Sequence, residues 1–293
     1  MKLIKQSFEF INQTDFSLIG IKKHIERCAR VSYKSEDKIT DTSYEKFVNM
    51  LESRGHDRPL EFGTVYLTLR GDDTNALRNI FTYTENPWTK IRKQVIKAEY
   101  DPNTHVVLNY VTTNYRVIVE NHLEEDLKYL CEPTEYHYKR YTAHMILDRG
   151  VMDEFRTHVG LSHLAESTRY CNYSKDKFDN EITFIKPCWL DDEKLKLYGP
   201  YHTVIRDKSP ESIFIANLNN VERDYLDLIK LGWTPQQARS ILPLGIKSEL
   251  ISCGFEDAWK NFFYRRDAPD AHPMAQEITK PMHQKFIKLT EMK

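Results

Sequence analysis

Glycine is scarce in this chain, with 10 glycines among 293 residues. This scarcity argues against a long glycine-rich phosphate loop, and the sequence contains no dinucleotide-binding or P-loop fingerprint. No apolar run approaches the length of a membrane span. The first residues, Met1-Lys2-Leu3-Ile4-Lys5-Gln6, continue into Ser, Glu and Asn rather than into the apolar core of a secretory signal. We therefore expect a cytoplasmic protein.

The sequence has no closely spaced cysteine pair and no strong excess of charge. Its five cysteines lie far apart, which favours neither a disulfide framework nor a structural zinc site. Lys and Arg (42) nearly balance Asp and Glu (43), giving a net charge of -1. This balance argues against a protein that coats nucleic acid or an anionic membrane. A small anionic ligand remains possible, because it requires only a few arginines.

The amino-acid composition is that of an ordinary globular protein. Hydrophobic residues make up 40% and charged residues 29% of the chain, and the length permits a sizeable core. There is no low-complexity segment, internal repeat or linker rich in Pro, Gly and Ser. We therefore expect a single domain over residues 1–293.

Apolar spacing and turn residues predict strands early in the chain and helices later, without regular alternation. This order favours an α+β fold with a mixed or antiparallel sheet. Thr234, Pro235 and Gln237 have the pattern of a capping box, and Pro243 ends the short helix that follows. Residues 175–211 are predicted to be rich in loops. The predicted strands are 64–69, 106–111, 115–119 and 141–147, and the other predicted helices are 41–54, 151–158, 213–228 and 255–264.

The densest polar segment covers residues 156–170, Arg-Thr-His-Val-Gly-Leu-Ser-His-Leu-Ala-Glu-Ser-Thr-Arg-Tyr. Hydroxyl groups donate hydrogen bonds to phosphate oxygens, and arginine binds phosphate in a bidentate manner. The segment therefore suits a phosphate or the edge of a pyrimidine. A capped helix end followed by a solvated loop would have the same composition, and both interpretations remain open at this point.

Two isolated arginines, Arg239 and Arg266, form a second candidate group. Each lies on or beside a short helix among apolar neighbours. An arginine held against apolar residues usually has an anionic partner. That partner is either a ligand phosphate or an internal Asp or Glu, and from these residues alone the internal ion pair is the simpler interpretation.

Three other patterns give weaker support for a catalytic or metal-binding site. Cys188 follows a proline but has no basic activator nearby, and a buried, inert cysteine is the commoner case. His158 and His163 are five residues apart, which does not place them on one helix face as a metal pair. Ser162 and Ser167 lie outside any Gly-x-Ser-x-Gly nucleophile elbow.

The polar segment resembles the signature of the flavin-dependent thymidylate synthases. That signature is Arg-His-Arg, seven residues, then Ser-x-Arg-Tyr. Here Thr157-His158-Val159 is followed, after seven residues, by Ser167-Thr168-Arg169-Tyr170. Other landmarks of the family follow in order between about residues 29 and 280, and residues 71–140 are an insertion relative to short members. These landmarks are Ala29–Tyr33, Gly55–Glu61, Asp148–Val151, Ala238–Pro243, Trp259–Arg266 and Ala271–Pro273.

The sequence departs from the family pattern at the flavin side. Thr157 and Val159 replace both signature arginines, which in the family contact the flavin, and Phe62 and Asp153 replace frequent histidines. Each charge-assisted hydrogen bond contributes about 1.5–3 kcal/mol, so we expect weaker flavin binding than in the family. Arg58 and Arg156 are close in sequence to the two positions and are candidates to compensate.

The resemblance implies a mixed α+β fold and a homotetramer whose active sites are each built from several subunits. It also implies reductive methylation of dUMP to dTMP, with methylenetetrahydrofolate as carbon donor and FAD, reduced by NADPH, as hydride donor. The alternatives are another pyrimidine or one-carbon outcome, or a non-catalytic nucleotide-binding relative. The resemblance assigns Ser167 and Arg266 to catalysis, Glu166, Ser167, Arg169, Arg239 and Arg266 to the nucleotide, and His56, Arg58, Glu61, His158, Asn261 and His272 to the flavin.

Overall fold

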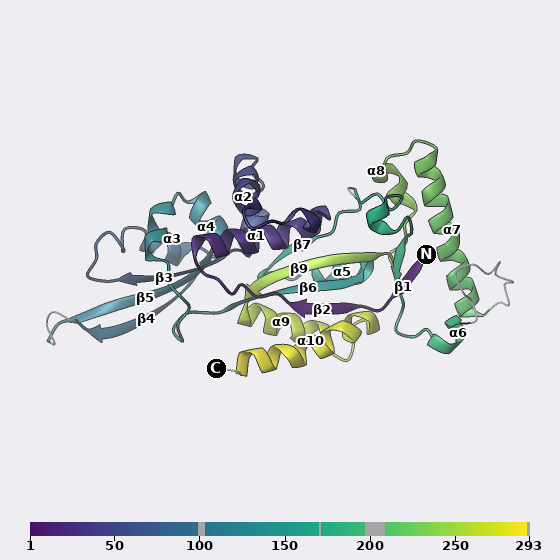
Figure 1. Cartoon of the computed structure of the whole chain (residues 1–293). Coiled ribbons are helices and arrows are strands. Elements are labelled where there is room, and N and C mark those ends of the chain that lie inside the picture. The colour runs from purple at the N-terminus through teal and green to yellow at the C-terminus, as the bar shows by residue number, and fades with distance from the viewer. Residues whose placement is uncertain (99–102, 170, 197–208, 292–293) are drawn as a thin grey trace.

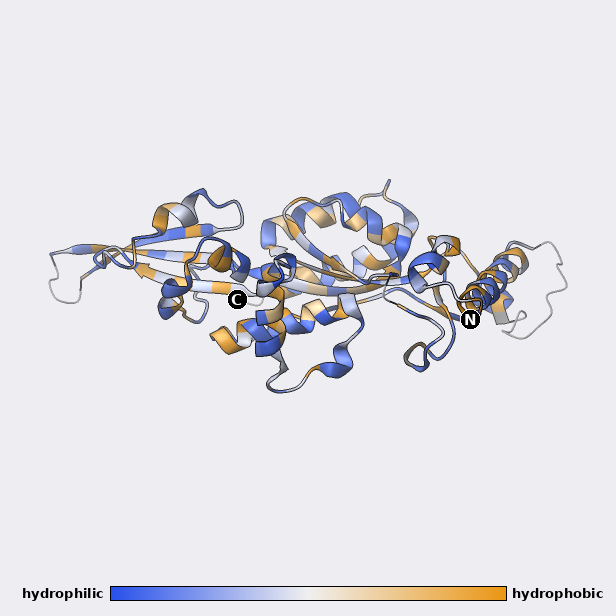
Figure 2. Ribbon diagram, turned by 90° about the horizontal axis from the view of Figure 1, so that it is seen from above, coloured by the Kyte–Doolittle hydropathy of each residue, from blue (hydrophilic) through white to orange (hydrophobic). Residues whose placement is uncertain are grey.

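The computed structural model describes residues 1–98, 103–169, 171–196 and 209–291. Three β-sheets lie one after another along the long axis of the molecule (Figure 1). A three-stranded sheet forms one end, a four-stranded sheet the centre and a two-stranded sheet the other end. Figure 2 shows the same elongated shape from above, with hydrophobic and hydrophilic residues interspersed along the helices.

The central sheet is antiparallel, with strand order β2-β6-β9-β7. Strand β9 is buried at eight consecutive positions, because helices cover both faces of the sheet. Successive side chains of a strand point to opposite faces, so Leu250 packs with the α9 and α10 side and Ile251 packs with the α1 side. The elements are β2 (Ser7–Phe10), β6 (Arg140–Asp148), β7 (Leu161–Ala165), β9 (Lys247–Phe255), α1 (Leu18–Tyr33), α5 (Arg149–Phe155), α9 (Glu256–Arg266) and α10 (Pro273–Glu291).

The sheet at the left of Figure 1 is also antiparallel, with strand order β3-β5-β4. Three helices and two short 3-10 helices pack around its inner end and its connections. The elements are β3 (Thr64–Arg70), β4 (Lys90–Lys97), β5 (His105–Asn114), α2 (Ser43–Ser53), α3 (Ile80–Glu85), α4 (Tyr115–Glu120), η2 (Arg58–Phe62) and η3 (Glu124–Tyr129). The short η1 (Glu36–Lys38) links α1 and α2.

At the other end, strands β1 and β8 pair in parallel beside a long amphipathic helix, α7. Tyr225 of α7 and Phe184 of β8 are fully buried in a separate hydrophobic cluster at this end. The elements are β1 (Lys2–Ile4), β8 (Thr183–Ile185), α6 (Asp192–Lys196), α7 (Pro210–Lys230), α8 (Pro235–Ala238), η4 (Asp176–Phe178) and η5 (Arg239–Ile241). Within the described residues, no helix is long and apolar enough to cross a membrane.

The structure confirms the α+β fold class and most of the predicted elements, and it corrects one of them. Residues 115–119 form helix α4 rather than a strand. The Asn114 side chain caps this helix by accepting a hydrogen bond from the Val117 backbone N–H, 3.1 Å away. The cap outweighs the strand propensity of the β-branched residues that follow it.

Two further regions differ from the prediction. The helix expected at 151–158 begins at Arg149 and ends at Phe155. The region 175–211 contains β8 and α6, and its part at 197–208 lies outside the described residues. The capping box at α8 is present, since the Gln237 side-chain oxygen accepts a hydrogen bond from the Thr234 backbone N–H at 2.9 Å.

Candidate active site

The three signature positions follow directly after α5 and point in different directions. Gly160, with φ +93°, turns the chain into β7, a conformation that glycine adopts without strain. The His158 side chain is buried, whereas Thr157 is exposed and Val159 is 91% exposed. The two positions that carry arginine in the family signature are therefore on the surface of this chain, and the histidine is in its interior.

Arg266, at the end of α9, is held by an internal carboxylate. Its Nη1 lies 2.8 Å from Glu154 Oε2, and its Nη2 donates to the Glu154 backbone carbonyl at 2.8 Å. Its Nε donates to Nε2 of His158 at 2.7 Å, and its Nη2 also donates to the Thr157 hydroxyl at 3.3 Å. Of the two partners predicted for this arginine, the structure shows the internal ion pair.

Burial, together with the charges of Arg266 and Arg265, lowers the pKa of His158 to about 4. The ring is therefore neutral at pH 7, in agreement with Nε2 accepting a hydrogen bond. Phe262 packs edge-on against the ring, with the two centroids 5.0 Å apart.

A second buried histidine, His163, lies on β7. Its Nδ1 is 2.8 Å from the Ser252 hydroxyl, and its Nε2 is 3.3 Å from the His158 carbonyl oxygen. Burial, together with the positive charges of Arg58 and Arg156, lowers the pKa of His163 to about 4, although the hydrogen bond to the His158 carbonyl raises it. Both arginines are exposed. Two exposed cations thus lie near the end of β7 that follows the signature positions.

The other end of β7 leads into Ser167, Thr168 and Arg169. Arg239 is exposed and donates from Nη1 to the Thr168 hydroxyl at 3.3 Å, which corrects the expectation that apolar residues surround it. Arg169, also exposed, donates from Nε to the Gln236 side-chain oxygen at 3.1 Å. No hydrogen bond of the Ser167 hydroxyl is present among the described residues, and Tyr170 lies outside them. This end therefore presents two arginines at the surface, beside the half-buried Ser167 and the buried Thr168.

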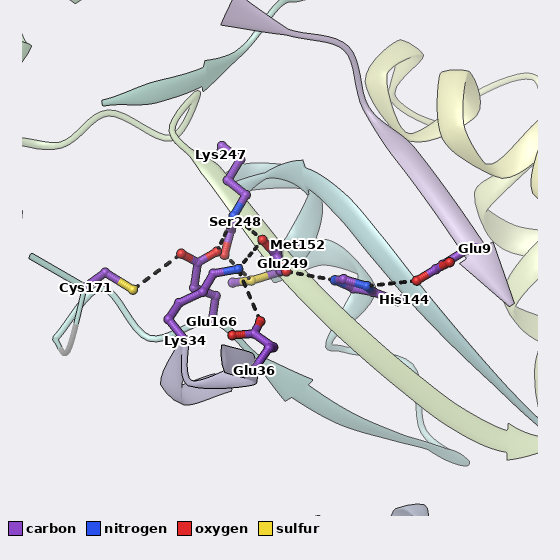
Figure 3. A network of polar contacts seen from close by, with 10 residues as sticks. All are labelled: Glu9, Lys34, Glu36, His144, Met152, Glu166, Cys171, Lys247, Ser248 and Glu249. Carbon is purple, nitrogen blue, oxygen red and sulfur yellow. Dashed lines mark hydrogen bonds and ion pairs between the residues drawn. The ribbon is translucent and has the colours of Figure 1, made fainter. Parts of the chain in front are cut away.

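Glu166 precedes Ser167 and is buried in a network of charges (Figure 3). Its Oε2 lies 3.0 Å from Lys247 Nζ, and its Oε1 accepts from the Cys171 thiol at 3.4 Å. Lys247 also pairs with Glu249, which pairs with Lys34 as well. Both carboxylate oxygens of Glu166, predicted to bind the substrate, thus have partners inside the protein.

Glu249 is at the centre of this network (Figure 3). Its Oε2 is 2.8 Å from His144 Nε2, and His144 Nδ1 is 3.6 Å from Glu9. Burial opposes ionisation of Glu249, but the hydrogen bond from His144 and the charges of Lys247 and Lys34 hold its pKa well below the ordinary value. Burial likewise opposes the charge of Lys34, yet Glu166 and Glu249 raise its pKa. Glu249 and Lys34 are therefore both charged at pH 7.

These contacts correct the structural expectations for residues 156–170. Residues 161–165 form a strand of the central sheet, so the segment is neither a capped helix end followed by a solvated loop nor one continuous polar surface. The Ser167 backbone N–H is 3.4 Å from the Ser32 carbonyl oxygen, and the Glu166 N–H donates to the Glu249 carbonyl at 2.8 Å. The backbone around Ser167 is thereby fixed to α1 and β9.

The residues predicted for the flavin are divided between surface and interior. His56, Arg58, Asn261 and His272 are exposed. Glu61 is buried, and its Oε1 lies 2.5 Å from Arg116 Nη1. The position after Glu61 is a fully buried phenylalanine. Glu61 therefore has an internal cationic partner, and the four exposed residues are the ones that a ligand can reach in a single chain.

Two of the three arginines predicted to bind the nucleotide, Arg239 and Arg266, lie at different ends of β7. Arg266 contacts His158 before the strand, and Arg239 contacts Thr168 after it. Five strand residues span about 17 Å at 3.3 Å per residue. Arg266 and Arg239 of one chain therefore contact residues at opposite ends of β7.

Sequence reasoning missed the lysines and acids of the network, above all Lys34, Lys247 and Glu249. Lys247-Ser248-Glu249 begins a segment that continues as Leu250-Ile251, and two charges at alternate positions of a buried strand are a signal that could have found them. Lys34 carries no such signal. It is itself the residue that ends α1, and its left-handed backbone, with φ 48°, is part of how it reaches Glu249.

Cys188, expected to be buried, is exposed, and all five cysteines are free.

Comparisons with known proteins place these observations in a family. The model of the family described as thymidylate synthase complementing protein, Thy1, matches residues 132–290, more than half of the chain. A search of curated proteins found no match.

Three solved structures are similar at low sequence identity. Two are of a UMP/dUMP methylase, PolB, from Streptomyces cacaoi. The one bound with 5-Br dUMP is 15% identical, with 99% of this chain and 93% of that chain covered and a TM-score of 0.42. The one bound with 5-Br UMP is 14% identical, with 99% and 92% covered and a TM-score of 0.43. Thymidylate synthase X from Helicobacter pylori, with FAD and dUMP, is 16% identical, with 50% and 66% covered and a TM-score of 0.36. On the match over residues 132–290, the chain belongs to the Thy1 family of thymidylate synthase complementing proteins.

Proposed function

We propose that this protein is a methyltransferase that converts dUMP to dTMP by reductive methylation of C5. The observation that carries the proposal is the intact Ser167-Thr168-Arg169 half of the signature within the family match, beside the exposed Arg239. Hydroxyl and guanidinium donors at one surface suit a nucleoside monophosphate, because both bind phosphate and carbonyl oxygens.

In this reaction the C5 proton of the pyrimidine is replaced by a methyl group, which combines a methylene carbon from methylenetetrahydrofolate with a hydride. C5 of uracil is a weak nucleophile until negative charge builds on the ring oxygens. Arg239 and Arg266 are proposed to bind dUMP and stabilise that charge, and Ser167 and Arg169 to orient the ring. Ser167 acts by position, since a serine nucleophile requires an adjacent base and none contacts its hydroxyl among the described residues.

FAD, when bound and reduced by NADPH, would supply the hydride. Its pyrophosphate requires cations, and Arg58 and Arg156 provide two exposed ones near the signature positions. These residues fit the cofactor, with His56, Asn261 and His272 as further exposed contacts and Glu61 and His158 behind them. Arg156 also pairs with Asp153, whose Oδ1 lies 3.3 Å from its Nη1, so its charge is partly neutralised within the chain. We therefore propose that FAD binds, but more weakly than with two signature arginines.

The separation of Arg239 and Arg266 supports an active site shared between copies of the chain. If one copy supplies the Arg239 end and another the Arg266 end, both arginines reach one nucleotide. A homotetramer with such sites, a single domain over 1–293 with an insertion at 71–140, and a cytoplasmic location all remain predictions.

The alternatives are methylation of another pyrimidine nucleotide, a different one-carbon outcome and a non-catalytic nucleotide-binding relative. The exposed Val159 and Thr157 favour the last of these, since both stand where the flavin-contacting arginines are expected. Tritium release from dUMP labelled at C5, with and without added FAD, tests the proposal. FAD-dependent release in the presence of methylenetetrahydrofolate and NADPH supports it, and nucleotide binding without release at saturating FAD contradicts it.

A further inference from the structure

A cleft of about 710 Å³ lies between the three-stranded sheet and the beginning of α9. One wall is β4, the outer strand at the lower edge of the sheet at the left of Figure 1. The other walls are the segment 133–139 and residues 255–260. This volume is in the range of clefts that hold a small organic ligand. The β4 wall belongs to residues 1–131, which the family match does not include.

Aromatic rings and cations alternate on the walls of this cleft. Lys90 Nζ lies 4.8 Å from the ring centroid of Phe255 and 5.5 Å from that of Tyr138. The Arg92 guanidinium lies 4.8 Å from the Tyr138 centroid. Cations held at ring faces keep donors available to a further ligand. Phe255 is buried and the Arg140 guanidinium also lies 5.7 Å from its centroid, so the half-buried Tyr138 offers the planar apolar surface.

The charges of the cleft are only partly paired. Lys90 pairs with Asp257 at 2.6 Å and Lys260 with Glu256 at 2.7 Å. Arg92 donates to the Glu135 backbone carbonyl at 3.2 Å, but among the described residues it forms no ion pair. Lys139 also lines the cleft and forms no ion pair there among the described residues. Among the described residues, Arg92, beside the Tyr138 ring, and Lys139 therefore have no carboxylate partner, and Glu135 is the one acidic residue of the cleft that likewise forms no ion pair.

We propose that this cleft binds a small planar aromatic molecule that carries an anionic group. The ring packs against Tyr138, and the anion pairs with Arg92 and Lys139. Carboxylate and phosphate share this chemistry, so an aromatic carboxylate and a nucleotide are separate arms of the test. The site is independent of the proposed methyl transfer, because it contains none of the residues assigned to the nucleotide or the flavin.

Calorimetric titration of the full chain with p-aminobenzoylglutamate tests the carboxylate arm, and titration with dUMP tests the phosphate arm. We expect saturable binding of at least one probe to wild type and about tenfold weaker binding of that probe to Arg92→Ala, the loss of one charge-assisted contact. Lys93→Ala is the matched control, since Lys93 is the next residue of β4, is exposed and does not line the cleft. Because dUMP has a proposed site elsewhere, only the part of its isotherm lost in Arg92→Ala counts for the cleft.

Tyr138→Phe keeps the ring and should bind like wild type, whereas Tyr138→Leu removes the ring and should bind weakly. Circular dichroism of each variant verifies that it folds. Absence of saturable p-aminobenzoylglutamate binding to wild type, together with a dUMP isotherm that Arg92→Ala leaves unchanged, would overturn the proposal. Equal weakening by Arg92→Ala and Lys93→Ala would also overturn it, because it would indicate attraction to a basic strand rather than a site. Neither result bears on tritium release, so failure here is distinct from failure of the proposed function.

Discussion

Arg266 and His158 form a hydrogen bond in which the guanidinium Nε donates to the imidazole Nε2 at 2.7 Å. The same arginine pairs with Glu154. A charge that already has an internal partner can bind a ligand anion only by sharing its donors or exchanging partners. This contact therefore determines how much Arg266 can contribute to a nucleotide site.

Replacing Arg266 with alanine should weaken dUMP binding by about 1.5–3 kcal/mol, the contribution of hydrogen bonds to a charged group. Arg265→Ala is the matched control, because Arg265 is adjacent on α9 and exposed. Calorimetry with dUMP measures the difference. A folded Arg266→Ala protein with wild-type affinity would remove Arg266 from the nucleotide site and leave the Glu154 pair as its role.

Stability should fall as the pH falls from about 6.5 to 4. His158 and His163 have pKa values lowered by burial to about 4, against an ordinary value of 6.5. The unfolded chain therefore binds more protons than the folded chain in this window, and protonation favours unfolding. Denaturant unfolding at several pH values measures the slope. The slope should be shallower in His158→Gln and unchanged in His105→Gln, which replaces an exposed histidine. Equal slopes in all three proteins would contradict the prediction.

The sequence predicts those elements whose determining contacts are between residues close together in the chain. The capping box at Thr234 and the amphipathic α7 were predictable, because their residues contact neighbours in the same helix. Strand 115–119 was predicted wrongly because the cap at Asn114 is a single side-chain contact. The central strand β9 was missed, since a strand buried on both faces shows no alternation of polar and apolar residues.

The candidate site follows the same rule. Ser167 and Arg169 were predicted as site residues because the signature is contiguous in sequence, and their roles stay predictions. The pairing of Arg266 with Glu154 was foreseen only as one of two possibilities, since the residues are 112 positions apart. Lys247 and Glu249 carry a local signal, but their contacts with Lys34 depend on how the end of α1 packs against β9, which no local pattern encodes.

Lys247→Met should destabilise the fold by about 3–5 kcal/mol, because it leaves Glu166 and Glu249 buried without this partner. Lys230→Met is the matched control. Lys230 pairs with Asp227 at 3.1 Å on the surface of α7, and such a pair contributes only about 0–1 kcal/mol. Urea unfolding measures both variants. Similar small losses in the two would show that the buried network contributes no more than a surface pair.

Ser167 should remain unmodified during turnover. Its hydroxyl has no hydrogen-bonded base among the described residues, and both nearby carboxylate oxygens of Glu166 are bound by Lys247 and Cys171. Ser167→Ala should therefore lower affinity for dUMP without abolishing turnover. Mass spectrometry of protein quenched during reaction examines the serine directly, and a nucleotide adduct on Ser167 would make it the nucleophile.

Thr157→Arg combined with Val159→Arg should tighten FAD binding and raise any flavin-dependent turnover. Thr157 is exposed and Val159 is 91% exposed, so both long side chains can enter solvent without disturbing the core. The added charges would stand near Arg58 and Arg156 and give the pyrophosphate two further bidentate donors. Titration with FAD at fixed salt compares the double variant with wild type. Leu231→Arg, which adds an arginine at a position that is 80% exposed at the end of α7, controls for a general gain in positive charge. If a neighbouring subunit already supplies the missing charge, wild type will purify fully loaded with FAD and the new arginines will crowd the site. That result would contradict weakened flavin binding.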